Sequence, residues 1–135
     1  MERLTYVLDT NVIADRMNAR EPASRRLIDT VSAGHQVILC QPVYYEVMRG
    51  LLKVNATRKM QFFQTTIMPL LDWFSLTDAD WQQAARFWAD ASNTGRQLAD
   101  TDLLIAAIAH RMNGIIVTAD ADFDALPVCR QNWRD

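Results

Sequence analysis

The sequence predicts an α/β fold in which helices cover both faces of a mostly parallel sheet. Short β-branched or aliphatic runs alternate along the chain with stretches of helical apolar spacing, as in repeated strand–helix units. The runs Thr5–Leu8, Gln36–Cys40 and Ile115–Val117 are largely apolar, which is typical of strands buried on both faces. The chain has 135 residues and is 50% apolar, so we expect one packed domain, 1–135.

The first half of the chain predicts strands and helices in alternation. Pro22 and Pro42 suit the first turn of a helix, where no backbone N–H is needed, and Gly34 suits a helix end. In order, we expect a strand at 5–8, a helix at 10–17, a helix at 22–31, a strand at 36–40 and a helix that opens at Pro42.

The second half continues the same pattern. Thr77 and Asp80 form a capped helix start, and Asn113-Gly114 is a strong helix stop. In order, we expect a helix at 57–67 broken by Pro69, a strand at 70–76, a helix from Thr77, a loop at 93–95, a helix at 101–112, a strand at 115–117 and a last strand at 127–129.

The composition indicates a cytoplasmic protein without a disulfide or zinc site. No apolar run is long enough to span a bilayer, and the N-terminus lacks a signal-peptide pattern. Cys40 and Cys129 lie within apolar stretches, so we expect both to be buried, reduced thiols. His35 and His110 lie far apart and have no zinc-type spacing to a cysteine.

The distribution of charge is more informative than the formal net charge of −2. No acid occurs between Val47 and Leu71, a stretch that contains basic residues only. These are Arg49, Lys53, Arg58 and Lys59, and we consider Arg49 and Lys53 as candidate contacts for phosphate groups. A solvated helix face explains the same stretch equally well.

Carboxylates interrupt otherwise apolar segments at several places. Asp9 follows the first strand, and Asp120 follows the strand Ile115–Val117. Glu46 lies in a mostly apolar helical stretch, and Asp102 opens an apolar helix. In open α/β sheets, ligands bind beyond the carboxyl ends of the strands, where Asp9 and Asp120 stand.

Each of these carboxylates also has an ordinary structural explanation. Asp9 can cap the next helix, and Asp102 can favour the positive end of its own helix. Glu46 can pair with Arg49, and the acidic run from Asp120 can form only a turn. Taken together, however, clustered carboxylates in apolar surroundings repel one another unless a cation neutralises them, and hard oxygen ligands indicate Mg²⁺ or Mn²⁺.

The ordered motifs Leu8-Asp9-Thr10-Asn11-Val12-Ile13, Glu46 after a proline-started helix, Asp102 to Ala109, and Val117 to Phe123 resemble those of PIN-domain nucleases, especially VapC-type toxins of toxin–antitoxin pairs. The closing Asn132-Trp133 is similar to the usual end of that family. The resemblance implies a three-layer α/β/α sandwich, Mg²⁺- or Mn²⁺-dependent cleavage of RNA, a small cognate antitoxin and a homodimer.

By motif position, the resemblance also implies the roles of individual residues. The acidic, metal-binding core comprises Asp9, Glu46, Asp102 and Asp120. Asn11 and Thr118 are polar support, Asp122 shares or replaces the role of Asp120, and Asp100 is a weaker candidate. The implied mechanism is metal-assisted hydrolysis of a phosphodiester.

Other functions fit less well. A haloacid-dehalogenase-type phosphatase needs a second aspartate and a threonine where this chain has Asn11 and Ile13. A calcium-binding EF-hand loop starting at Asp120 would have Ala125 and Gln131 in place of glycine and glutamate. A non-catalytic module that binds a partner remains as the alternative outside the enzymes.

Two helical stretches carry more apolar residues than one buried face requires. Core packing absorbs them, or some remain outside as a groove for an amphipathic partner segment. The residues concerned are Tyr44, Tyr45, Met48, Leu51 and Leu52 on the first stretch, and Phe62, Phe63, Ile67 and Met68 on the second.

Overall fold

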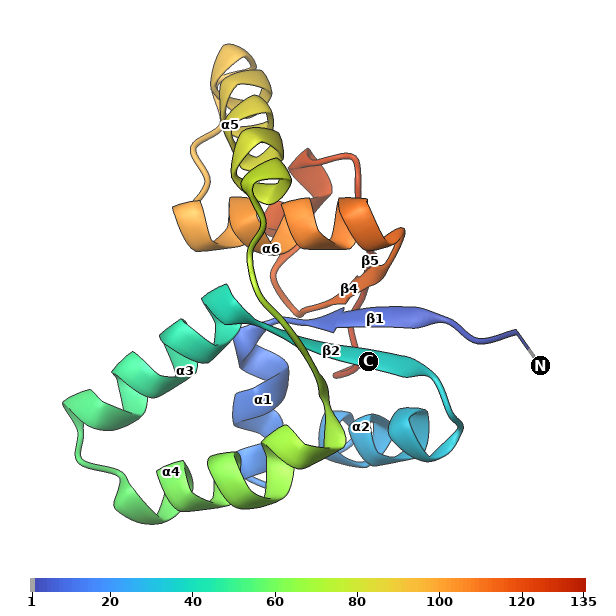
Figure 1. Cartoon of the computed structure of the whole chain (residues 1–135), viewed down its shortest axis with the longest axis vertical. Coiled ribbons are helices and arrows are strands. Elements are labelled where there is room, and N and C mark those ends of the chain that lie inside the picture. Colours follow the sequence, from blue (N-terminus) through green and yellow to red (C-terminus); the bar gives the residue numbers. More distant parts are fainter. Residues whose placement is uncertain (1) are drawn as a thin grey trace.

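The computed structural model describes residues 2–135, which form a five-stranded sheet with helices on both faces (Figure 1). The strand order is β3-β2-β1-β4-β5, and every neighbouring pair is parallel. The strands are β1 (Thr5–Leu8), β2 (Gln36–Cys40), β3 (Asp72–Phe74), β4 (Ile115–Val117) and β5 (Cys129–Gln131). The α/β class is therefore confirmed.

The helices fill the two outer layers of a sandwich. In Figure 1, α1 and α2 lie on one side of the sheet, and α6 lies on the other with α5 packed outside it. Their bounds are α1 (Thr10–Met17), α2 (Ala23–Ser32), α3 (Gln41–Lys53), α4 (Thr57–Phe62), α5 (Asp78–Asn93) and α6 (Asp100–Met112). The three-layer α/β/α arrangement that the sequence motifs implied is confirmed.

The central strand β1 is the point at which the chain reverses its direction across the sheet. It pairs with β2 on one side and with β4 on the other, so Val7 is opposite both Ile38 and Ile116. The segments that leave β1, β2 and β4 consequently emerge at the same edge. This is the switch point at which α/β sheets place their ligands.

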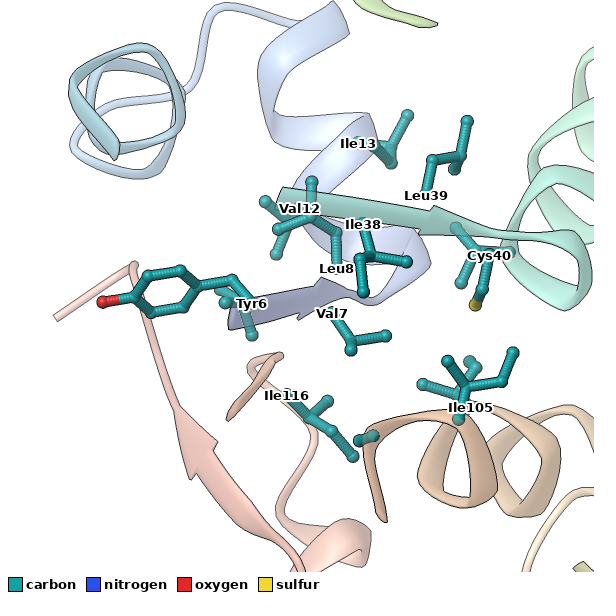
Figure 2. Packing of buried hydrophobic residues seen from close by; sticks show 14 of the residues in the cluster. Tyr6, Val7, Leu8, Val12, Ile13, Ile38, Leu39, Cys40, Ile105 and Ile116 are labelled. Atoms are coloured by element: carbon teal, nitrogen blue, oxygen red, sulfur yellow. The ribbon is translucent and has the colours of Figure 1, made fainter. Parts of the chain in front are cut away.

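The core is built from the apolar strand residues and from a helix that is apolar on all sides. Val7, Ile38 and Ile116 are fully buried from three adjacent strands (Figure 2). In α6, every residue from Leu103 to Ala109 is buried, because the sheet covers one face and α5 another. A helix buried all round needs no polar face, which explains the apolar run of the sequence.

Three expectations about elements are corrected. The expected strand at 70–76 is only Asp72–Phe74, because Met68–Leu70 forms a short 3₁₀ turn. The expected helix at 57–67 ends as an α-helix at Phe62 and continues as the π-helical turn Phe63–Ile67. The last strand is Cys129–Gln131, not 127–129, because a proline such as Pro127 has no N–H for a strand pair.

The expectation for the cysteines is correct at one site and wrong at the other. Cys40 is completely buried at the end of β2, and Cys129 is exposed. Cys129 begins the edge strand β5, where one side of the sheet has no further strand to cover it. Both thiols are free, as the sequence predicted.

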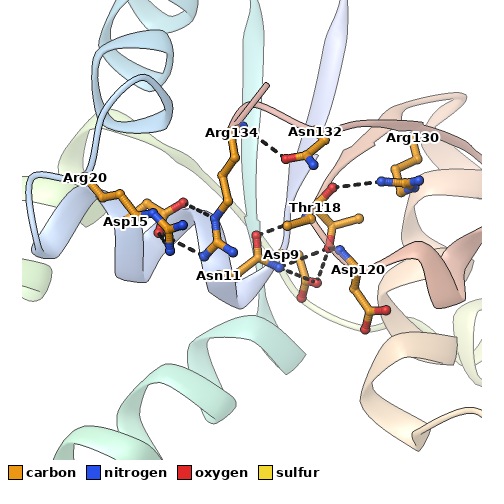
Figure 3. Close-up of polar contacts among 10 residues, drawn as sticks. Asp9, Asn11, Asp15, Arg20, Thr118, Asp120, Arg130, Asn132 and Arg134 are labelled. Carbon is orange, nitrogen blue, oxygen red and sulfur yellow. Dashed lines mark hydrogen bonds and ion pairs between the residues drawn. The ribbon is translucent and has the colours of Figure 1, made fainter.

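Two ion pairs between an arginine and a buried aspartate stabilise the outer helices. Asp80 closes a capping box with Thr77 at the start of α5 and accepts hydrogen bonds from Arg111 at 2.8 and 3.0 Å. Burial alone would raise the pKa of Asp80, but the hydrogen bonds from Arg111 and Thr77 outweigh it and lower that pKa. Asp15 of α1 is held in the same bidentate way by Arg134, which ties α1 to the end of the chain (Figure 3).

We expect the substitution Arg111→Ala to destabilise the fold by about 2–4 kcal/mol, because it leaves the carboxylate of Asp80 buried without its partner. Arg130→Ala provides a matched control, since Arg130 binds Asp124 with nearly the same distances, 2.9 and 3.0 Å. The side chain of Asp80 is 1% exposed and that of Asp124 is 59% exposed. Urea unfolding of both variants measures the difference, and equal losses of stability would contradict the role of burial.

Candidate active site

Asp9 is the buried centre of the site. It follows β1 directly, and its backbone N–H donates to the carbonyl of Val117 at 3.0 Å, which ties it to the end of β4. Its side chain caps α1, since Oδ1 accepts from the N–H of Thr10 at 2.7 Å. The residue is 5% exposed. The ordinary capping role is therefore real, but it occupies only one carboxylate oxygen.

The second oxygen of Asp9 is held by side chains from two elements (Figure 3). The Thr118 hydroxyl donates to Oδ2 at 2.7 Å, and the Asn11 amide donates to it at 3.2 Å. The same amide reaches Thr118 at 3.0 Å, and the Asn11 carbonyl oxygen accepts from the N–H of Ala119. Asn11 and Thr118 thus both orient the carboxylate of Asp9.

Glu46 reaches the site from α3. Its Oε1 accepts from the Thr10 hydroxyl at 3.0 Å, and its Oε2 lies 3.4 Å from a guanidinium nitrogen of Arg49. The guanidinium of Arg49 also lies over the ring of Tyr45, at 5.0 Å from its centre. The helical pairing of Glu46 with Arg49 is therefore present, alongside a position facing the acidic site.

Asp120 and Asp122 complete the edge of the site after β4. The N–H of Asp120 donates to Thr118, and its carboxylate accepts from the N–H of Asp122 at 2.9 Å. Asp120 is half-buried and lies within the network of Asp9, whereas Asp122 is exposed. The geometry favours Asp120 over Asp122 as the fourth acidic member.

The pKa of Asp102 reports how closely the acidic side chains gather. It is raised to about 7, first by burial and then by the negative charges of Asp9, Asp120, Glu46 and Asp122, in that order. Burial likewise raises the pKa of Asp9, against hydrogen bonds from Thr118 and Thr10 that lower it. Side chains from four separate elements therefore share one electrostatic environment.

Nearby cations compensate only part of this charge. Arg49 is paired with Glu46, and Arg130, which lies near Thr118, is paired with Asp124. The thiol of Cys40 stays protonated, because burial raises its pKa to about 12. The described part of the chain therefore leaves a concentration of negative charge on oxygen donors, and a hard divalent cation matches such donors.

The carboxylates do not form a closed ligand cage. Among residues 2–135, no three His, Cys, Asp or Glu side chains make a group that holds a metal ion as they stand. Mg²⁺ does not require such a group, since it commonly binds through one or two carboxylates and keeps several waters. The donor chemistry of the site fits a cation of this kind.

The remaining predicted residues lie outside the cluster. Asp100 is exposed and faces a groove with Trp81 and Trp88 instead. Lys53 is exposed in the last turn of α3, one turn beyond Arg49. The residue that sequence reasoning missed is Thr10, whose N–H binds Asp9 and whose hydroxyl binds Glu46. Its position directly after Asp9 was the available signal.

The apolar surplus of α3 and the following segment is mostly absorbed by the core. Phe63 and Ile67 are fully buried and Leu51 nearly so, whereas Tyr45 and Leu52 are each 56% exposed. A small apolar groove of about 160 Å³ remains between α1 and α3, next to Glu46. It is lined by Thr10, Ala14, Met17, Glu46, Val47, Gly50 and Leu51.

Comparison with known proteins gives a family and curated relatives. The model of the PIN domain family matches residues 6–128. Ribonuclease VapC11 of Mycobacterium tuberculosis is 31% identical over 104 residues, which cover 76% of this chain and 73% of that protein. VapC ribonuclease Mb1587 of Mycobacterium bovis matches with the same identity and coverage.

Solved structures share the fold at lower identity. The structure of DNA-bound VapBC from Salmonella typhimurium superposes with a TM-score of 0.84 at 19% identity, covering 96% of this chain and 98% of that one. VapBC2 from Rickettsia felis, bound to a promoter DNA fragment, gives 0.82 at 19% identity, with 96% and 99% covered. FitAcB from Neisseria gonorrhoeae gives 0.78 at 23% identity, with 95% and 97% covered.

We expect Asp102→Asn to stabilise the metal-free protein at neutral and alkaline pH. The folded state raises the pKa of Asp102 to about 7, well above the unfolded value of about 3.9, so its carboxylate opposes folding once it ionises. The gain over the parent should be absent below about pH 4, grow toward pH 7 and then level off at about 1–2 kcal/mol, allowing for solvent screening.

Thermal melts in EDTA from pH 4 to pH 9 measure this gain. Asp100→Asn is the matched control, because it removes an exposed acid from the same first turn of α6. A gain for Asp102→Asn that does not vary with pH, or that Asp100→Asn reproduces, would show that the folded state does not raise the pKa of Asp102.

Proposed function

Because this chain belongs to the PIN-domain family and to its VapC-type ribonucleases, we propose that it is a metal-dependent endoribonuclease and the toxin of a toxin–antitoxin pair. The observation that carries the proposal is the gathering of Asp9, Glu46, Asp102 and Asp120 at one edge of the sheet, where Arg49 compensates only part of their negative charge. We also propose that residues 1–135 form a single domain, as expected from the sequence.

In this proposal the four carboxylates hold Mg²⁺ or Mn²⁺. When bound, such a cation offsets charge on the phosphoryl oxygens and makes the attacking water more acidic. Both carboxylate oxygens of Asp9 are held by hydrogen bonds, from Thr10 on one and from Thr118 and Asn11 on the other. The site is thus oriented by hydrogen bonds that exist before any ligand arrives.

The remaining carboxylates differ in what holds them. Thr10 fixes the position of Glu46, and the N–H of Asp122 fixes that of Asp120. Asp102 is the member whose pKa is raised to about 7, so its carboxylate can take up or release a proton near neutral pH. A carboxylate of the cluster would accept the proton of the attacking water. Because water is the attacking group, this mechanism needs no serine, cysteine or histidine nucleophile. The thiol of Cys40 also stays protonated, since burial raises its pKa to about 12.

The RNA substrate requires positive groups beside the acidic site. Arg49 and Lys53 stand one turn apart on α3, and Glu46 lies on the same helix facing the cluster. We propose that Arg49 and Lys53 bind the phosphate groups of the RNA. Arg58 and Lys59 of α4 are exposed and extend the same basic stretch.

We further propose a small cognate antitoxin, a homodimer and a cytoplasmic location for this chain. The groove between α1 and α3 supports the first of these, because it is apolar and has Glu46 at its rim. An apolar side chain of a partner segment fits the groove, and a neighbouring arginine or lysine would pair with the acidic cluster. No helix within residues 2–135 is long and apolar enough to cross a membrane.

A phosphatase of the haloacid-dehalogenase type is disfavoured by the role of Asn11. That chemistry needs an acid at this position, whereas the Asn11 amide holds Asp9 and Thr118 together. A non-catalytic partner-binding module is the remaining alternative. It is separated from the nuclease by an RNA cleavage assay with and without added Mg²⁺ or Mn²⁺.

We expect Asp9→Asn to lower RNA cleavage by roughly 100-fold or more, because even partners of metal ligands typically change activity by about 10- to 100-fold. The fold should remain intact and its stability equal or slightly higher, since burial and neighbouring charges disfavour this carboxylate. Asp124→Asn is the control, as it removes an exposed acid paired with Arg130 outside the cluster. Near-parental cleavage by Asp9→Asn would remove Asp9 from the site.

We expect the double substitution Arg49→Gln with Lys53→Gln to flatten the salt dependence of RNA binding. Each lost phosphate contact reduces the slope of log K against log salt by about 0.7 for single strands. Fluorescence anisotropy at several salt concentrations measures the slope. A double variant of the exposed residues Arg3 and Arg25 is the control, and equal slopes for both double variants would leave α3 without a special role.

A further inference from the structure

A groove lined by residues of α5 and α6 lies where these two helices pack together; Figure 1 shows the two helices. It measures about 480 Å³ and is lined by Trp81, Ala84, Ala85, Trp88, Asp100, Leu103 and Leu104. The cleavage chemistry uses none of these side chains. The groove therefore needs an explanation of its own.

Two indole rings project from one side of α5 at this groove. Trp81 and Trp88 are seven residues apart, which is about two helical turns, so they stand on the same face. They remain 57% and 55% exposed. Between them the helix presents only Ala84 and Ala85, and these small side chains leave the space that makes the groove.

The floor of the groove is apolar and its only charged lining residue is acidic. Leu103 and Leu104 are buried and form part of the lining, and Asp100 is exposed beside them. Among residues 2–135, no lysine or arginine lines the groove, so these residues offer nothing there that attracts a phosphate. Flat aromatic faces with an apolar floor instead suit a nucleobase, because every base has a face that stacks on indole.

Asp100 adds a preference among the bases. An ionised carboxylate only accepts hydrogen bonds, so it pairs with a base edge that donates. Guanine presents two adjacent donors, its ring N–H and its amino group, which match the two oxygens of a carboxylate. Uracil presents a single ring N–H between two carbonyl oxygens, and these oxygens repel the carboxylate.

The groove is continuous with the proposed RNA site. Asp100 and Asp102 belong to the same first turn of α6, and Asp102 faces the acidic cluster while Asp100 faces the groove. An RNA strand whose phosphate lies at the cluster would therefore pass beside the turn that carries Asp100. Continuity with that site favours RNA over a second copy of this chain as the occupant.

From these observations we propose that the groove between α5 and α6 binds an unpaired base of the RNA substrate, with Trp81 and Trp88 as stacking surfaces and Asp100 selecting guanine over uracil. This inference rests on the proposed ribonuclease function. It adds a base-reading subsite to an active site that otherwise contacts only the phosphodiester backbone.

Binding of short RNA to the Asp9→Asn protein tests the proposal without cleavage. The probes are fluorescent single-stranded pentanucleotides of uridine, with and without one central guanosine. Trp81→Leu and Trp88→Leu should each weaken binding of the guanosine probe by about 5- to 100-fold. Trp73→Leu, which removes a 46% exposed tryptophan on β3, should leave the affinity unchanged.

Two further variants separate stacking from simple packing. Trp88→Phe keeps an aromatic face and should restore part of the affinity that Trp88→Leu loses. Asp100→Asn should reduce the preference for the guanosine probe over the uridine probe while leaving uridine binding nearly unchanged. Equal affinities for parent and both leucine variants, or an unchanged base preference in Asp100→Asn, would overturn the proposal.

The molar mass of each variant, measured by light scattering over a range of concentrations, identifies the competing occupant. If the leucine variants lose RNA affinity only where their mass falls from dimer to monomer, the groove binds a second copy and the proposal is wrong. Cleavage of saturating RNA by the same variants with Asp9 intact keeps the two hypotheses apart. If the variants still cleave RNA and bind it as the parent does, the groove does not bind a base, while the proposed ribonuclease function stands.

Discussion

The burial of the Asp9 carboxylate at the end of β1 is the constraint on which the rest of the site depends. A buried charge is costly unless hydrogen bonds satisfy it, and here the ends of two strands and the start of α1 supply them. Thr118 can bind Asp9 only because β4 pairs directly with β1 in parallel. The strand order of the sheet is therefore what makes this carboxylate possible.

The other carboxylates gather around Asp9 at a further cost in repulsion. Their negative charges add to the effect of burial in raising the pKa of Asp102 to about 7. Rigid elements hold the charges together: α6 is buried almost all round, and Thr10 ties α3 to the start of α1. Such a site exchanges some stability of the free protein for affinity toward a cation.

Much of this arrangement follows from local patterns in the sequence. Apolar strands that end in Asp9 and in Thr118-Ala119-Asp120 predict a site at the carboxyl edge of a parallel sheet, and the structure places these residues together. The role of Thr10 did not follow, because its hydroxyl acts on Glu46, thirty-six residues away in the sequence. The direction in which Asp100 faces depends on how α5 crosses α6, and no local pattern encodes that crossing.

The central claim is that Asp9, Glu46, Asp102 and Asp120 form one site for a divalent cation. A ligand that binds only the folded state stabilises it by RT ln(1 + [L]/Kd), so the melting temperature should rise with added Mn²⁺ or Mg²⁺ at pH 8. We expect the melting temperature to rise clearly for the parent and for Asp124→Asn, and much less for Asp9→Asn and Asp102→Asn. An equal rise for all four proteins would contradict this claim.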